Sequence, residues 1–258
     1  MISESHLNIR DKCPEEFILI GRSKPVVSAK PRGGVVVYKN MNSYIDLELI
    51  SDELVDCVVF RVLPVNIVIA AVYIPPTNSK YSTPQYMENL QLLLSSFRST
   101  PIYIVGDLNA RYGEGSKKNS PNLSFADNPD KVMNTNGHAL NSILNEEKDF
   151  VILNGLHTSK TQCDSDFTFF RGELCSQIDI AITNSPDSIS SFTFLEKNVY
   201  SDHRPLSLSI SAKAKLPLDL VDKCATNLFE YKHYDVNRRP RRTVKLDKID
   251  AGKAAEDI

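Results

Sequence analysis

The sequence lacks the features that mark membrane-bound or secreted proteins. No run of apolar residues approaches the roughly 20 that a membrane-spanning helix needs. Residues 1–20 carry neither the charged nor the apolar region of a signal peptide. We therefore expect a soluble, intracellular protein that has no membrane partner.

The sequence also has few cysteines and no paired-cysteine motif. The five cysteines are odd in number and widely spaced: Cys13, Cys57, Cys163, Cys175 and Cys224. Without a C-x-x-C pair, this pattern indicates neither a disulfide framework nor a zinc site. It favours a reducing compartment.

An excess of positive charge is missing as well. Lys and Arg number 30 against 32 Asp and Glu, which gives a formal net charge of -2 and a pI near 6.2. This balance excludes a histone-like, generally basic protein, although it leaves room for a local cationic groove. With 258 residues, of which 41% are hydrophobic, the chain is typical of one globular domain with a short tail.

Short runs rich in β-branched residues dominate what is present. These runs predict strands at 34–39, 55–63, 66–74, 101–107, 150–155, 177–183 and 205–211. Pro64 and Val65 separate the second run from the third, which predicts a tight antiparallel hairpin. The last run alternates apolar residues with serine, as a strand with one solvated face does.

Two helices are expected between the strands. The first has Thr83 as its N-cap and Pro84 at its first position. The second covers about 136–146. Their apolar faces consist of Tyr86, Leu90, Leu93, Leu94 and Phe97 in the first helix and of Leu140, Ile143 and Leu144 in the second. Strands mixed with helices predict a layered α/β or α+β domain.

The chain is expected to form one domain over 1–212, followed by a linker or flexible tail over 213–258. From about Lys213 the alternation of apolar and polar residues is lost, and a basic segment occupies 237–245. Its RRPRR stretch is either a nuclear localisation or nucleic-acid patch, or part of a disordered tail. Residues 111–134 form a long polar loop, which is either functional or disordered.

Polar residues recur at the ends of the apolar runs. They are Glu4, Tyr73, Asp107, Asn109, Asp179, Asp202 and His203. If strand ends converge on one rim, such a set makes a site for a hard cation with a general base beside it. Phosphodiester cleavage needs these parts, because a metal neutralises the phosphate and a base activates water.

Each of these residues also has an ordinary structural interpretation. Asp107 and Asn109 can form an Asx-turn, and Asp202 can cap a turn or helix before His203. Tyr73 can be a core residue. Asp179 is harder to explain in this way, since burying a carboxylate without a partner is costly.

Seven motifs, in order, resemble the endonuclease/exonuclease/phosphatase superfamily, most closely the apurinic-like endonuclease domain of non-LTR retrotransposons. They are ISESHL (2–7), PRGGVVVYK (31–39), VYIPP (72–76), IVGDLNA (104–110), FTFF (167–170), SQIDIAIT (176–183) and SDHRPL (201–206). The resemblance covers roughly residues 2–212. It implies a four-layer sandwich of two packed mixed β-sheets flanked by helices.

The resemblance also implies an activity and its partners. We expect a DNA-nicking endonuclease that depends on Mg²⁺ or Mn²⁺ and leaves a 3′-hydroxyl usable as a primer. Its partners would be DNA and a reverse-transcriptase chain or domain, and its location nuclear. There are two alternatives: a catalytically inactive nucleic-acid-binding remnant, and a phosphatase of the same superfamily. The retrotransposon-like residues of the PRGGVVVYK and VYIPP motifs argue against the phosphatase.

Roles carry over from the family position by position. Glu4 would be a metal ligand, Tyr73 would contact the scissile phosphate, and Asn109 would hydrogen-bond that phosphate. Asp202 would be a metal-linked carboxylate that also orients the neighbouring histidine.

The remaining family roles concern the attacking water and the developing charge. Asp107 would orient or deprotonate the water, and Asp179 would orient catalytic groups near the phosphate. His203 would bind the phosphate and its developing charge, because a paired carboxylate fixes the imidazole tautomer and favours its charged form.

Basic side chains near these motifs are candidates for phosphate contacts. They are Arg111, Lys117, Lys118, Arg171 and Arg204. The alternative for each is an ordinary solvated surface. Family members begin with a strand, a helix and a second strand before the Glu motif, and we expect this opening unit to be absent here because Glu4 follows Met1 so closely.

Overall fold

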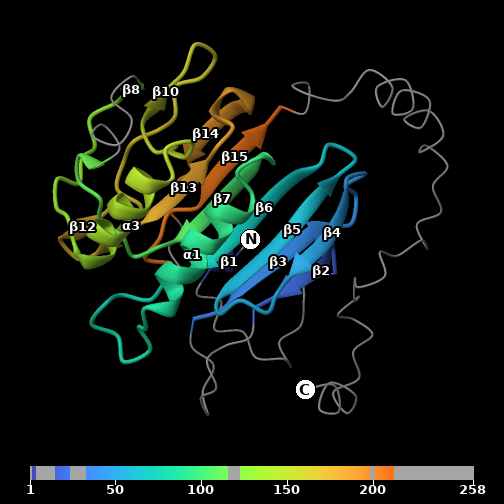
Figure 1. The fold of residues 1–258 in the computed structure, drawn as a ribbon, viewed down its shortest axis with the longest axis horizontal. Helices are drawn as coiled ribbons and strands as arrows, with labels where there is room; N and C mark the ends of the chain where they lie inside the picture. Colours follow the sequence, from blue (N-terminus) through green and yellow to red (C-terminus); the bar gives the residue numbers. More distant parts are fainter. Residues whose placement is uncertain (1, 4–14, 24–32, 116–122, 198–200, 212–258) are drawn as a thin grey trace. The chain divides into compact units, whose positions relative to one another are not determined.

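The computed structural model describes residues 2–3, 15–23, 33–115, 123–197 and 201–211. It divides into two compact units (Figure 1). The first comprises Met1–Ala71 with Lys215–Ile258, and the second comprises Val72–Ala214. The expected tail over 213–258 and its basic segment lie outside the described residues, and the domain limit at residue 212 stays a prediction.

The first unit is built from antiparallel strands. Its three-stranded sheet has the order β1 (Ile2–Ser3), β3 (Val35–Asn40) and β2 (Phe17–Arg22). The three consecutive valines of β3, Val35, Val36 and Val37, are buried and form part of the core.

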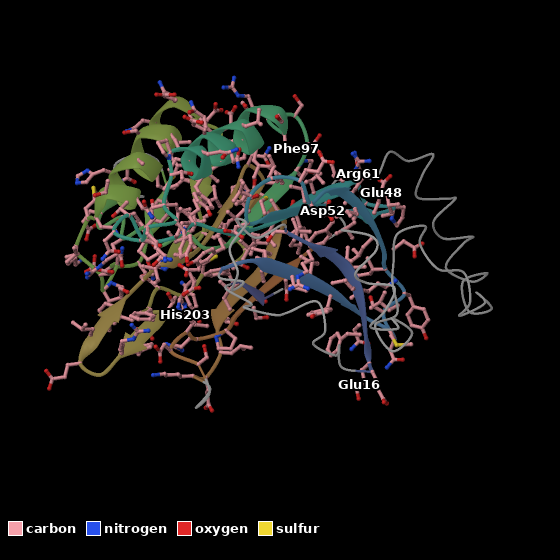
Figure 2. The ribbon with its side chains drawn as sticks, turned by 90° about the horizontal axis from the view of Figure 1, so that it is seen from below. Glu16, Glu48, Asp52, Arg61, Phe97 and His203 are labelled. Atoms are coloured by element: carbon pink, nitrogen blue, oxygen red, sulfur yellow. The ribbon has the colours of Figure 1, made fainter. Side chains whose placement is uncertain are left out.

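A second group of strands in this unit begins a six-stranded sheet of order β4-β5-β6-β7-β13-β9. Strand β4 (Asp46–Ser51) pairs antiparallel with β5 (Cys57–Leu63), and Glu48 faces Arg61 in this register. The two side chains form an ion pair of 3.0 Å, and both are labelled in Figure 2. A turn over 64–66 leads to β6 (Ile67–Tyr73), the sheet neighbour of β5, as the sequence predicts.

In the second unit the sheet contains β7 (Ile102–Asp107), β13 (Asp179–Thr183) and β9 (Val151–Ile152). Strand β13 lies antiparallel to both of its neighbours. Every residue of β13 is buried. This explains why the sequence shows a continuous apolar run there rather than an alternating one.

Two helices lie beside each other in front of β7 and β13 in Figure 1: α1 (Gln85–Ser96) and α3 (Thr135–Glu146). Helix α1 is assigned from Gln85 with Pro84 as its N-cap, one residue after the expected cap, although Pro84 already has the helical dihedral angles expected of a first helical position. Helix α3 begins one residue before the expected start, because the Asn134 side chain accepts from Gly137 N at 2.8 Å and caps it.

Short strand pairs complete the second unit. They are β8 (Ser124–Phe125) with β10 (Leu156–His157), β11 (Phe169–Arg171) with β12 (Leu174–Ser176), and β14 (Ile189–Phe194) with β15 (Leu206–Ile210). A 3₁₀ turn, η1 (Pro186–Ser188), precedes β14. All seven expected strands occur, and the α/β class is confirmed. No helix in the described segments is long and apolar enough to cross a membrane.

Candidate active site

Asp107 ends β7, and the turn that follows depends on the residues on either side of it. A Cβ atom on Gly106 would lie 1.8 Å from the backbone oxygen of Val72, so the position requires glycine. Asn109 has a φ of 46°, in the left-handed region that asparagine tolerates. Its backbone N–H donates to Asp107 Oδ1 at 2.9 Å, which closes an Asx-turn.

The Asn109 side chain also holds the Asp107 carboxylate. Its Nδ2 donates to Asp107 Oδ2 at 2.9 Å and to the Ile74 carbonyl at 3.0 Å. The Asx-turn interpretation is therefore geometrically correct, and it does not compete with a functional one, because the turn fixes the carboxylate. The expected bond from Asn109 to a phosphate stays a prediction, since both amide hydrogens have partners within the protein.

Asp179, the first residue of β13, lies directly opposite Asp107 in the antiparallel register. Side chains opposite each other point to the same face, with Cβ atoms about 5 Å apart. The exposed fractions of Asp107 and Asp179 are only 1% and 6%. Two buried carboxylates facing each other are costly unless each is compensated, which marks this place as a candidate site.

Asp179 is compensated by His203, whose Nδ1 donates to Asp179 Oδ2 at 2.8 Å. A strand-like contact places the histidine there: Phe169 forms a β-bridge with His203, and Arg204 N donates to Thr168 O at 2.7 Å. The Phe169 ring lies 5.1 Å from the imidazole in an edge-on arrangement. His203, labelled in Figure 2, is therefore held on two sides.

The His203 ring pairs with Asp179 in this structure, and the expectation that Asp202 orients the histidine stays a prediction. The Asp202 carboxylate instead accepts from Arg171, from Nε at 3.1 Å and from Nη2 at 3.0 Å. Asp179, distant in sequence, is the carboxylate that contacts the His203 ring.

The other predicted catalytic and metal residues are placed less fully. Tyr73 is buried at the end of β6, directly before Ile74, whose backbone contacts both Asp107 and Asn109. Glu4, Lys117 and Lys118 lie outside the described residues.

The three arginines expected to contact DNA each pair with an aspartate. Arg111 binds the buried Asp130, and this hydrogen bond raises the pKa of the guanidinium. Arg204 binds Asp166 and also donates to the carbonyls of Leu195 and Phe194, at 3.0 and 3.2 Å. The Arg171 side chain, 72% exposed, is the most accessible of the three.

Sequence reasoning missed Thr168, which is fully buried. Its Oγ1 accepts from Ile178 N at 3.1 Å and from Asp179 N at 3.0 Å, so it fixes the start of β13. Its position within the FTFF motif was the signal that could have identified it. Asp130 was missed because a polar loop gives no sign that one of its carboxylates is buried.

The oxygen donors present suit a hard divalent cation in kind. Asp107 and Asp202 offer carboxylate oxygens, which Mg²⁺ and Mn²⁺ prefer. Among the residues that the structure describes, however, no group of three or more His, Cys, Asp or Glu side chains is arranged to hold a metal. The described residues therefore do not complete a metal site by themselves, and Glu4 remains the predicted further ligand.

One of three similar solved structures has a TM-score above 0.5 and supports the fold. An AP endonuclease from Archaeoglobus fulgidus is similar with a TM-score of 0.51 and 14% identity, over 81% of this chain and 86% of that one. The 3′ phosphatase NExo from Neisseria, bound to a product DNA hairpin, is similar with a TM-score of 0.47 and 12% identity, over 71% of this chain and 77% of that one. An endonuclease/exonuclease/phosphatase family protein from Leptotrichia buccalis C-1013-b is similar with a TM-score of 0.47 and 14% identity, over 77% of this chain and 72% of that one.

Comparison with curated proteins finds no match. The family model described as endonuclease-reverse transcriptase matches residues 67–207, more than half of the chain. This range contains Asp107, Asn109, Asp179 and His203. The chain therefore belongs to the endonuclease-reverse transcriptase family of the endonuclease/exonuclease/phosphatase superfamily.

Proposed function

We propose that the chain is a divalent-metal-dependent endonuclease of the retrotransposon type, which nicks DNA and leaves a 3′-hydroxyl that can prime reverse transcription. The observation that carries this proposal is the buried Asp107 carboxylate opposite the Asp179–His203 pair. The description of the family, which joins an endonuclease to a reverse transcriptase, supports the retrotransposon type and a reverse-transcriptase partner.

In this proposal the residues divide the work of phosphodiester hydrolysis. Asp107, held by Asn109, orients or deprotonates the attacking water. The Asp179 carboxylate fixes the tautomer of His203 and favours the imidazolium, which stabilises negative charge developing on the phosphate. Tyr73 contacts the same phosphate.

A bound Mg²⁺ or Mn²⁺ would neutralise phosphate charge, with Asp202 and Glu4 as its proposed ligands. For Asp202 to serve, its contact with Arg171 must be shared with the metal or released. Arg171 is then a proposed phosphate contact, since its side chain is 72% exposed and its ion pair with Asp202 lies at the surface. The proposed location, the nucleus, follows from the substrate.

Relaxation of supercoiled plasmid tests the activity. The parent chain with Mg²⁺ should convert supercoiled to open-circular DNA, and Asp107→Ala and His203→Ala should each slow nicking by about 10²-fold or more. Asp149→Ala and His138→Ala, which change exposed residues of the same types, should leave the rate unchanged.

Three results would contradict the proposal in different ways. A parent that shifts DNA on a gel without nicking it would indicate a nucleic-acid-binding remnant. Release of phosphate from a 3′-phosphorylated oligonucleotide without nicking would indicate a phosphatase. Equal nicking by the parent and His203→Ala would refute the assigned mechanism.

A further inference from the structure

The Asp130 carboxylate is a buried anion near the candidate site that accepts several hydrogen bonds. Its side chain is 1% exposed. Arg111 approaches it as a fork, with Nε 2.8 Å from Oδ2 and Nη2 2.7 Å from Oδ1. Two backbone amides also donate to it, Gln177 N at 3.0 Å and Val132 N at 3.2 Å. We call Arg111, Asp130 and Gln177 the clasp.

The clasp joins the two chain segments that carry the opposed carboxylates. The paired register of β7 and β13 reaches Asp107 and Asp179, and a further backbone bond runs from Leu108 N to Ile178 O at 3.1 Å. Beyond that bond the chain turns at Asn109. Asp130 then links the side chain of Arg111, after the turn, to the backbone of Gln177, before β13.

Both ends of the clasp are fixed by further hydrogen bonds. The Gln177 side chain accepts from the Tyr112 hydroxyl and donates to Asp166 O at 2.7 Å. On the other side, Asn134 accepts from Arg111 N at 3.0 Å and donates to Asn109 O at 2.9 Å. Because both ends are held, a change in the distance between Arg111 and Gln177 would also move the residues next to them.

We propose that Arg111 is a positioning residue: acting through Asp130, it holds the loop after β7 against the start of β13 and so sets the separation of Asp107 and Asp179. This inference rests on the proposed function. It replaces the phosphate contact expected of Arg111 from sequence. The Arg111 side chain is only 30% exposed, and a DNA phosphate would have to compete with a buried carboxylate already held by a bidentate bond.

The same unit contains a matched control pair. Arg98 binds the 5%-exposed Glu147 as a similar fork, with Nε 2.8 Å from Oε2 and Nη2 2.7 Å from Oε1. This pair ties the end of α1 to the end of α3 rather than the two strands of the site. Arg111→Met and Arg98→Met each leave a buried carboxylate without its guanidinium, and both should destabilise the fold.

Nicking kinetics on the full chain separate positioning from DNA contact and from general destabilisation. Arg111→Met should lower kcat by roughly tenfold to 10²-fold while KM stays within about twofold, because misplaced groups slow the chemical step. Arg98→Met should keep the parent kcat. The kcat of Arg111→Lys should lie between those of the parent and Arg111→Met, since an ammonium keeps the charge and cannot form the bidentate bond.

The salt dependence of binding to a plasmid fragment distinguishes a phosphate contact by Arg111 from a positioning role. If Arg111 contacts a phosphate, Arg111→Met will raise KM, leave kcat unchanged and reduce the salt slope by about one. That result would overturn the inference. An equal loss of kcat in Arg98→Met would overturn it as well, since the effect would then be one of stability alone.

Amide hydrogen exchange tests the same device without relying on activity. Arg111→Met should accelerate exchange at Gln177 and Leu108 by roughly tenfold, whereas Arg98→Met should not, because local opening follows the loss of local bonds. Unchanged exchange at both amides would refute the inference even in an active enzyme. A parent that fails to nick DNA would refute the proposed function, and exchange would then decide by itself whether Arg111 sets the two strand ends.

Discussion

Replacing Thr168 by valine removes an acceptor that two buried amides share. Oγ1 of this residue takes hydrogen bonds from Ile178 N and Asp179 N, and the side chain is fully buried. Valine has nearly the same shape, so water has little room to enter. Each unsatisfied buried N–H costs about 1–3 kcal/mol, and with partial relaxation we expect Thr168→Val to lose about 3 kcal/mol.

Urea unfolding monitored by circular dichroism measures this loss. With a denaturant dependence of about 2 kcal/mol per molar urea, the transition midpoint should fall by roughly 1.5 M. Nicking should fall as well, because Asp179 N is one of the two amides and the Asp179 carboxylate holds His203.

Thr168→Ser is the control, since it keeps the hydroxyl and loses one methyl group. It should cost about 1 kcal/mol and retain most of the nicking rate. If Thr168→Val is as stable and as active as Thr168→Ser, the hydroxyl does not fix the start of β13 and the reasoning fails.

Three further predictions concern the core, a close contact and the metal. Burial raises the pKa of the Cys57 thiol to about 12 and of the Cys163 thiol to about 11; both should resist iodoacetamide at pH 8 until urea is added. Because these thiols ionise above about pH 8.5 when unfolded, stability should decrease as pH rises past that value, and rapid alkylation of the native protein would contradict this. Gly106→Ala should prevent soluble expression, since its Cβ would meet the Val72 backbone at 1.8 Å, whereas Gly172→Ala, with nothing within 4 Å, should cost about 1 kcal/mol for its positive φ; equal thermal stability of the two variants would refute the packing argument. EDTA should abolish nicking and added Mg²⁺ or Mn²⁺ should restore it, so that undiminished nicking in EDTA would exclude the proposed metal dependence.

Most of the strands that the sequence predicts have contiguous apolar residues, whereas β15 alternates apolar residues with serine. Strand β13 is recognisable because all of it is buried. Strand β14 was missed because its sequence mixes serine and threonine with inward-facing residues, and only Ile189, Phe192 and Phe194 are buried. Such a strand is defined by its partner β15 rather than by its own pattern.

The candidate site was predictable in its residues and not in its contacts. Asp107, Asp179 and His203 stand at positions that the sequence marks, and the structure brings them together. Which carboxylate contacts the histidine depends on side-chain direction, which adjacency in the sequence does not give. The Arg111–Asp130 pair could not be read from the chain, because its two members are joined only by the folding of the loop.

Because Asp107 and Asp179 face each other, the register of β13 against β7 is a functional constraint. Side chains alternate along a strand, so a slip of one residue would bring Ile178 or Ile180 opposite Asp107 and turn Asp179 to the other face. One inserted or deleted residue inside β13 would therefore separate the two carboxylates without removing either. We expect changes of length to be tolerated better in turns that hold no site residue, where no such alternation has to be kept.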